Sequence, residues 1–430
     1  MRRIDMKYGK DEIAIELPKA WEEQIEIIGA PPENHVFRAE DDRAMILDAL
    51  DHPHGSPPLE SLVSPGDNVV IVTSDISRPM PTDKVLPPVI ERLLAANVAP
   101  EDITVVFALG VHRPHTDAER ETLLGSTSQL GIRAVDSNQE DVVHLGFTPR
   151  GTPVEVFRPV LDADHVVCLG NVEYHYFAGY SGGYKAILPG ICTSRTVSHN
   201  HKMLSDPCSK AGIMEGNPVR EDIDSVADLL SVDFIVNVVL DHRRQIASCV
   251  SGHPIEAHRR ASRDLDEMNQ IEIPTRADFV VAGAGGHPKD MNLYQAQKAL
   301  EFATHFAREG APILLVAACS EGYGNEVMAK WFREGEGPKS LLTRLREEFE
   351  LGGHKAAMIA RAVVRNPVWI VSDMSKRAVS DAFLRYVTHD AGQPIRLPAE
   401  LINHIQDGWQ NDSQIYVLPN AASMLARVTD

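Results

Sequence analysis

Short apolar runs alternate with longer amphipathic stretches along most of the chain. Apolar runs at residues 68–73, 103–108 and 164–169 have the length and the β-branched content of buried strands. Helical periodicity covers residues 84–96, and a Thr-Asp-Ala-Glu capping pattern begins another helix at residue 116. Strands that alternate with helices predict an α/β fold with a mostly parallel sheet.

The same alternation begins again in the second half of the chain. Strands are predicted at residues 278–282, 312–318 and 368–371, and a polar loop follows each of them. Between the two series of strands, residues 271–275 include a proline and indicate a joint between domains.

We therefore predict two lobes, each with a mostly parallel sheet flanked by helices, and an active site in the cleft between them. The N-terminal domain is predicted to span residues 1–272, and a smaller, Rossmann-like domain to span residues 276–430. The pattern does not assign the last predicted strand, residues 413–419, to one lobe. Its return to the N-terminal domain is left open.

Polar side chains follow three predicted strands of the first lobe. Asp75 and Arg78 come after the first strand, His112 after the second and His175 after the third. Ligands of open α/β sheets bind outside the carboxyl ends of strands, so these positions favour one shared site. By position alone, Asp75 is equally suited to cap the next helix, and a lone histidine is more often structural than catalytic.

A glycine-rich stretch, HYFAGYSGGYKAILPGI at residues 175–191, continues from the third of these strands. Glycine allows backbone to approach a ligand closely. The stretch is not the phosphate loop of a nucleoside triphosphatase, because Ala186 follows Lys185 where a Ser or Thr would hold magnesium. Lys185 is a candidate covalent anchor for a carbonyl or acyl group, and the alternative is a lysine that neutralises an anionic ligand.

A second glycine cluster, at residues 283–286, follows a predicted strand of the second lobe. It lacks the third glycine of a dinucleotide-binding fingerprint at the required place. We therefore interpret it as a strand-to-helix turn.

Four histidines fall in or near the predicted crevice, namely His112, His175, His199 and His201. Imidazole suits nickel, copper, zinc or iron. The four show no His-x-x-x-His spacing and no thiolate partners, so at most one or two are predicted to bind metal. Since His199 and His201 lie two positions apart on a predicted helix, about 200° around its axis, only one of them faces the site.

The composition narrows the class of protein. The chain has 430 residues, of which 43% are hydrophobic and 24% charged, and its formal net charge is −19. This acidity argues against a nucleic-acid partner and against an anionic membrane surface, since both require clustered Lys and Arg. No apolar run approaches the length of a membrane span, and no Cys-x-x-Cys pair occurs. We expect a cytoplasmic protein that acts on a small molecule.

Five segments together carry a resemblance to a known family. They are SDISRP at residues 74–79, ALGVHRPHT at 108–116, the glycine-rich stretch, HNHKM at 199–203 and MNLYQAQKAL at 291–300. In this order, over both predicted lobes, they resemble the lactate racemase family of nickel-pincer-nucleotide enzymes. The resemblance implies a racemase or epimerase that inverts the C2 stereocentre of a small 2-hydroxy acid.

The resemblance also implies a cofactor, a nickel-pincer nucleotide of the pyridinium-3,5-bisthiocarboxylic acid mononucleotide type. A thioamide would join it to Lys185, and nickel would be bound by its ring carbon, its two sulfurs and His201. Ser181, Gly182 and Gly183 would contact the cofactor, and we expect the glycines to give clearance to its flat ring. Proteins that synthesise and attach the cofactor would be partners of this chain.

For catalysis, the resemblance implies that His112 and His175 act as opposed acid and base while hydride passes reversibly between the substrate and the pyridinium ring. Arg78 would hold the substrate carboxylate, and Asp75 would orient Arg78 or the cofactor.

Three further residues of the resemblance lie in the second predicted lobe. Gln295 and Lys298 would close over the substrate, and Tyr294 would form a wall of its pocket. Packing of the Tyr294 ring on the face of its own helix is an equally good explanation for an aromatic residue at this position.

Two other functions are compatible with these residues. A sugar-acid lyase or dehydratase would use the histidines for proton transfer without hydride chemistry. A non-catalytic nickel- or anion-binding protein would close over its ligand without turnover, but it would not need an acid–base pair beside an anchored lysine. The motifs leave open which 2-hydroxy acid is the substrate and how many copies of the chain associate.

Overall fold

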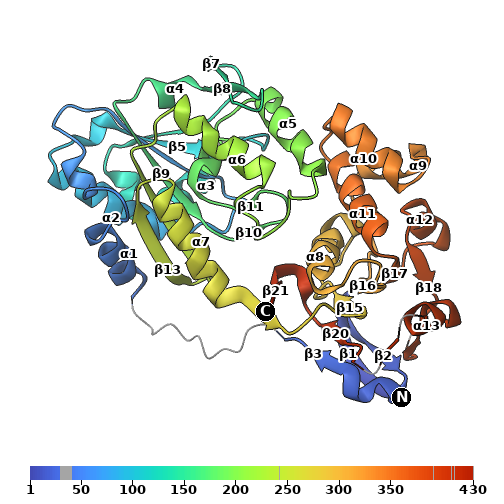
Figure 1. Cartoon of the computed structure of the whole chain (residues 1–430). Coiled ribbons are helices and arrows are strands. Elements are labelled where there is room, and N and C mark those ends of the chain that lie inside the picture. Colours follow the sequence, from blue (N-terminus) through green and yellow to red (C-terminus); the bar gives the residue numbers. More distant parts are fainter. Residues whose placement is uncertain (30–40, 242, 391, 408, 411, 430) are drawn as a thin grey trace. The chain divides into compact units, whose positions relative to one another are not determined.

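The structure is a computed structural model that describes residues 1–29, 41–241, 243–390, 392–407, 409–410 and 412–429. The chain forms two units (Figure 1). The first, which we call the split unit, consists of Met1–Glu33 together with Asn269–Asp430. The second, which we call the continuous unit, consists of Asn34–Met268.

The continuous unit is built on a six-stranded sheet of order β13-β12-β9-β4-β5-β6, in which only β13 runs antiparallel to its neighbour. The predicted strands at 68–73, 103–108 and 164–169 are confirmed as β4, β5 and β9. The strands are β4 (Val69–Ser74), β5 (Ile103–Ala108), β6 (Arg133–Asp136), β9 (His165–Asn171), β12 (Phe234–Leu240) and β13 (Ile246–Gly252).

Helices cover this sheet because their apolar residues recur on one face. On α2 (Thr82–Ala95), Val85, Val89 and Leu93 are fully buried against apolar residues of the sheet, including Ile71 of β4. The remaining helices of the unit are α1 (Asp42–Asp51), α3 (Asp117–Leu124), α4 (Arg158–Leu161), α5 (Ser194–Lys202), α6 (Pro218–Asp224) and α7 (Glu256–Asn269). Two hairpins complete it, β7 (Val142–Phe147) with β8 (Pro153–Phe157) and β10 (Tyr174–His175) with β11 (Gly179–Tyr180).

The split unit has its own six-stranded sheet, of order β18-β17-β16-β15-β20-β3, and all its pairings are parallel. The strands are β3 (Ile25–Ile27), β15 (Phe279–Gly283), β16 (Ile313–Val316), β17 (Val368–Val371), β18 (Arg385–Val387) and β20 (Ile415–Leu418). Its helices are α8 (Leu293–Phe306), α9 (Glu326–Glu334), α10 (Pro338–Glu347), α11 (Gly353–Arg365), α12 (Lys376–Asp381) and α13 (Ala399–Gln406). Smaller sheets join β1 (Arg2–Tyr8), β2 (Asp11–Leu17) and β19 (Ile395–Arg396), and β14 (Gln270–Ile273) with β21 (Leu425–Val428).

The predicted domain boundaries are wrong at the start of the chain. The prediction placed residue 1 onward in the N-terminal domain, whereas β3 pairs with β20 and β2 pairs with β19 in the split unit. The predicted last strand, 413–419, whose lobe the sequence left open, lies as β20 between β15 and β3 in the split unit. Local apolar patterns do not show which distant strand a segment pairs with, and this explains both the wrong boundary and the open assignment. In the described part of the chain, no helix combines the length and the apolar character that a bilayer crossing requires.

We predict that Trp21→Ala destabilises the split unit by ~3–5 kcal/mol, because it empties a large buried site. Trp21 is 4% exposed, and its ring stacks on Trp409 at 5.4 Å and meets Phe279 edge-on at 6.5 Å. Thermal unfolding followed by limited proteolysis and fragment mapping should show early cleavage within residues 269–430. The control, Leu93→Ala, should instead expose the continuous unit, and early cleavage there in Trp21→Ala would contradict the assignment.

Candidate active site

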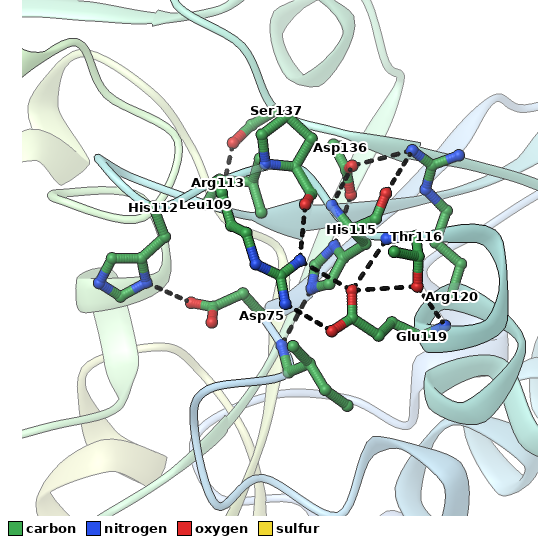
Figure 2. Close-up of polar contacts among 12 residues, drawn as sticks. Asp75, Leu109, His112, Arg113, His115, Thr116, Glu119, Arg120, Asp136 and Ser137 are labelled. Carbon is green, nitrogen blue, oxygen red and sulfur yellow. Dashed lines mark hydrogen bonds and ion pairs between the residues drawn. The ribbon is translucent and has the colours of Figure 1, made fainter.

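Asp75 and His112 come together at the carboxyl ends of neighbouring strands. Asp75 follows β4 and His112 lies in the loop after β5, and Figure 2 shows the imidazole turned toward the carboxylate. His112 Nδ1 lies 3.1 Å from Asp75 Oδ2, and the backbone N–H of Ser77 donates to Asp75 Oδ1 at 2.8 Å. Burial opposes ionisation of Asp75, but the hydrogen bonds from His112 and Ser77 outweigh it and lower the pKa of Asp75 to about 2.

This pair defines the tautomer of the His112 ring. An ionised carboxylate only accepts hydrogen bonds, so His112 Nδ1 carries the proton and donates it to Asp75. In the neutral ring, Nε2 is then the atom with the free lone pair. The prediction gave Asp75 the task of orienting Arg78 or the cofactor. Its contact with Arg78 Nε is longer, at 3.9 Å, so Asp75 is better placed to orient His112.

A second histidine, His115, joins the same two loops and was not predicted as a site residue. Its Nδ1 lies 2.6 Å from Asp136 Oδ1, and its Nε2 accepts the backbone N–H of Ile76 at 3.0 Å (Figure 2). Arg120 also binds Asp136, at 3.0 Å. The loop of His112 is thereby tied to the loop of Asp75. The motif at 108–116 contains both histidines, but nothing in the sequence indicates which of them is bonded on both nitrogens.

A cavity of about 290 Å³ opens beside these loops. Its lining residues are Asp75, Ile76, Ser77, His112, Arg113 and His115. The Arg113 guanidinium is engaged by Glu119 at 2.6 and 2.9 Å. Of the residues predicted to share a crevice, Asp75 and His112 line this cavity, which is large enough for a small organic molecule.

His175 and His201 both contact the buried Phe177 ring. The ring centroids of His175 and Phe177 are 4.4 Å apart, and those of Phe177 and His201 are 4.8 Å apart, both edge-on. The backbone N–H of Ala178 donates to His175 Nδ1 at 3.2 Å, so the proton of the neutral ring is on Nε2. Burial and then the charges of Lys185, His201 and Arg78 lower the pKa of His175 well below its ordinary value.

Lys185 lies in a short 3₁₀ turn, Gly183–Ala186, at the centre of the glycine-rich stretch. Burial, followed by repulsion from Arg78 and Arg220, lowers the pKa of its amine to about 7, although Glu173 opposes the shift. A large part of the amine is therefore neutral and nucleophilic near pH 7. The continuous unit thus brings Arg78, His175, Lys185 and His201 into one electrostatic neighbourhood.

The glycine-rich stretch rests on a buried guanidinium that was not predicted. Arg220 of α6 is fully buried and donates from Nε to the Ala178 carbonyl at 3.3 Å and from Nη2 to the Tyr180 carbonyl. Its Nη1 donates to Asp224 at 3.2 Å. In the sequence, Arg220 belongs to a charged helical segment and resembles a surface residue, so no local signal indicates its burial.

The predicted reason for Gly182 and Gly183 is wrong. Both have positive φ, 80° and 58°, but their Cβ directions are filled by protein. A Cβ on Gly182 would lie 2.7 Å from Asn237 Oδ1, and one on Gly183 would lie 2.9 Å from the His258 ring. These glycines therefore allow close contact with β12 and α7, and they do not clear space for a flat ring on that side. Ser181 donates to the Asn171 carbonyl at 2.8 Å, and contact of this residue or these glycines with a cofactor stays a prediction.

The two histidines of α5 point to different surroundings. Thr193 caps this helix by accepting from the backbone N–H of Thr196. His199 is exposed, and its Nδ1 contacts the Arg195 carbonyl at 3.2 Å. His201 instead contacts Phe177 and the Asn200 side chain. The described residues contain no group of three or more His, Cys, Asp or Glu side chains placed to hold a metal ion.

The remaining predicted residues belong to the split unit and follow one another on α8. The Tyr294 ring lies 5.3 Å from Lys355 Nζ and 6.5 Å from the His354 ring, both of α11. Gln295 is half-buried and Lys298 is exposed. Tyr294 and Lys298 are four residues apart, so they lie on the same face of the helix.

Family models match most of the chain. The model of the lactate racemase N-terminal domain matches residues 8–212, and that of the lactate racemase C-terminal domain matches residues 273–426. A lactate racemase of Thermoanaerobacterium thermosaccharolyticum is 30% identical over 439 residues, which cover 99% of this chain and 100% of that protein. A lactate racemase of Lactiplantibacillus plantarum is 31% identical over 336 residues, which cover 76% of this chain and 78% of that protein.

Solved structures agree with this match. The lactate racemase apoprotein of T. thermosaccharolyticum superposes with a TM-score of 0.83 at 28% identity, covering 99% of this chain and 100% of that one. A Thermotoga maritima protein superposes with a TM-score of 0.59 at 17% identity, covering 87% of this chain and 100% of that one, and shares the fold.

We predict that Asp75→Asn lowers the free energy of unfolding by about 2 kcal/mol at pH 7, and by progressively less as the pH falls from 4 to 2. The folded pKa of Asp75 is depressed, so its stabilisation is present above the unfolded pKa and is lost as protonation approaches the folded value. Denaturant unfolding at several pH values measures the difference. Asp117→Asn, at a side chain 97% exposed, should show little change, and a pH-independent deficit in Asp75→Asn would contradict this explanation.

We predict that Lys185 reacts with acetic anhydride with a pH midpoint near 7, because its neutral amine is the nucleophile. Pulse labelling followed by mass spectrometry of the Lys185 peptide measures the profile. In the denaturant-unfolded chain, the same peptide should show the ordinary lysine midpoint of about 10.4. Identical profiles in the folded and unfolded chains would contradict the lowered pKa.

Proposed function

Because the chain belongs to the lactate racemase family and is an enzyme of the isomerase class, we propose that it inverts the C2 stereocentre of a small 2-hydroxy acid. Lactate is the substrate named for its curated relatives, and a short 2-hydroxy acid suits the cavity beside Asp75 and His112. The observation that carries the proposal is the position of Lys185 in the glycine-rich stretch, with its pKa lowered by burial, in the neighbourhood of Arg78, His175 and His201.

These residues fit a nickel-pincer nucleotide. Lys185 supplies a nucleophilic amine for a covalent bond to the cofactor, and His201 supplies one imidazole ligand for nickel. The chemistry that such a group supplies when bound is the reversible acceptance of hydride from C2 of the substrate. Because the described residues offer no metal cage of their own, a metal ligated largely by a tethered nucleotide suits this site.

The two proposed acid–base histidines enter the reaction in complementary tautomers. His112 Nε2 has the lone pair that removes the substrate hydroxyl proton, and ionised Asp75 stabilises the imidazolium that forms. His175 Nε2 carries a proton and donates a hydrogen bond to the substrate oxygen, and it can give up that proton only after Nδ1 has been protonated. We assign the first proton transfer to His112, because His175 can take a proton at Nδ1 only by giving up the Ala178 N–H bond.

Arg78 is proposed to bind the substrate carboxylate. Its side chain is 55% exposed, so the planar guanidinium is accessible for bidentate contact with an anion. Gln295 and Lys298 are proposed to bind substrate as well, with Tyr294 as an apolar wall. The fixed contacts of the Tyr294 ring with His354 and Lys355 suit such a wall.

The proposed function requires partners that synthesise the cofactor and attach it to Lys185. We further propose a cytoplasmic location. The free cysteines, Cys168, Cys192, Cys208, Cys249 and Cys319, suit a reducing compartment.

The proposal is tested on protein produced together with the cofactor-synthesis enzymes. Intact mass should exceed that of the bare chain, metal analysis should find one nickel, and a single enantiomer of lactate should become a racemic mixture. With deuterium at C2, the label should stay in the product, because hydride returns to the carbon from which it left.

Lys185→Arg is the matched control, because it keeps a cation and cannot form the thioamide. It should lack the added mass and the activity. His112→Ala should keep the added mass and lose turnover by roughly 10²–10⁴-fold. Loss of deuterium to solvent would favour the lyase-type proton transfer, and full activity in Lys185→Arg would overturn the covalent anchor.

A further inference from the structure

The side chain of Asn200, next to His201 on α5, has one possible orientation. Asn200 is fully buried, and its Nδ2 donates to the Val219 carbonyl at 3.2 Å and to Asp222 Oδ2 at 2.9 Å. A carbonyl and a carboxylate only accept, so the NH₂ group must face them. Asn200 Oδ1 therefore faces His201 Nδ1, at 3.1 Å.

Asp222 holds this amide in place. It is fully buried on α6 and accepts from Thr148 Oγ1 at 2.5 Å and from Thr152 Oγ1 at 2.8 Å, in addition to Asn200. Both threonines are buried in the turn between β7 and β8. Removing one of these donors would leave part of the buried Asp222 carboxylate without a hydrogen bond, which is strongly destabilising. The β7–β8 turn, α6 and the Asn200 side chain are therefore held in one arrangement.

The amide in turn determines the tautomer of His201. Asn200 Oδ1 only accepts, so His201 Nδ1 must carry the proton, and the lone pair of the neutral ring is on Nε2. Hydrogen bonds of this kind to the second ring nitrogen fix the orientation of histidine ligands and raise their basicity.

We propose that Asn200, anchored by Asp222, Thr148 and Thr152, is a positioning residue that fixes His201 as an Nε2 ligand for nickel. The role of His201 as a nickel ligand rests on the proposed function. The tautomer of His201 belongs to the chain itself and exists without cofactor. Asn200 has no proposed contact with substrate, so its effect is on metal retention.

The first test uses the protein without cofactor, labelled with ¹⁵N-histidine. Nitrogen–proton correlation spectra, assigned with His201→Gln, should show His201 protonated at Nδ1 in the unsubstituted protein. Asn200→Leu has similar volume and removes the acceptor, and it also removes the Asn200 donor to Asp222. In this variant the signal should move toward the Nε2-protonated form, and the dispersion of the spectrum checks that the fold is retained. His201 protonated at Nε2 in the unsubstituted protein would overturn the proposal.

The second test measures nickel loss from cofactor-loaded protein during a chelator chase, with the mass at Lys185 followed in parallel. Asn200→Leu should lose nickel 10–100-fold faster while the added mass remains, as expected for loss of a partner of a ligating histidine. Thr196→Val is the matched control. It removes a buried acceptor of the Glu155 N–H on the same helix and leaves Asn200 intact, so its nickel loss should be unchanged.

Equal nickel retention in Asn200→Leu and the unsubstituted protein would overturn the proposal. Equal acceleration in Thr196→Val would overturn it too, because general loosening of α5 would then explain the effect. If the unsubstituted protein, produced with the cofactor-synthesis enzymes, carried neither nickel nor added mass, the proposed function would be contradicted instead. The tautomer measurement on the protein without cofactor would still decide the role of Asn200.

Discussion

The site depends on a positive charge buried beneath the glycine-rich stretch. Arg220 binds the Ala178 and Tyr180 carbonyls and is itself paired with Asp224, which Arg259 also binds. Such a charge is tolerated in the interior only when its donors are satisfied, so the loop carbonyls cannot move without a large penalty. The same charge contributes to the lowered pKa of Lys185 and of His175. Arg220 thus holds the backbone of the glycine-rich stretch and helps to keep Lys185 and His175 neutral.

Imidazole orientation in the continuous unit follows one physical rule, that the partner of one ring nitrogen decides the state of the other. Asp75 and Asn200 accept from Nδ1 of His112 and His201, whereas the Ala178 N–H donates to Nδ1 of His175. The two imidazole rings that contact Phe177 therefore have opposite tautomers. His115 is bonded on both nitrogens, which suits a role in fixing loops.

The sequence predicts the parts of the structure that have local causes. Alternating apolar and amphipathic runs located β4, β5 and β9, and the strand-end rule placed Asp75 and His112 at one edge. The partners of β3 and β20 depend on contacts between distant segments, and local periodicity does not encode them. Arg220 was missed for a similar reason, because its charged helical neighbours suggest a surface and only the tertiary contacts bury it. For Gly182 and Gly183, the residue type shows that no side chain fits at these positions. It does not show whether the space is occupied by a ligand or, as here, by neighbouring protein atoms.

The interrupted course of the split unit has a consequence for synthesis on the ribosome. The continuous unit is complete once residue 268 has emerged, so it can fold while the rest of the chain is still being made. β2 and β3 are made early, yet their parallel partners β19 and β20 are among the last segments translated. At ordinary elongation rates the wait is on the order of ten seconds or more. Throughout that time the partner of β3 does not yet exist, so the backbone groups of this segment are open to pairing with another chain.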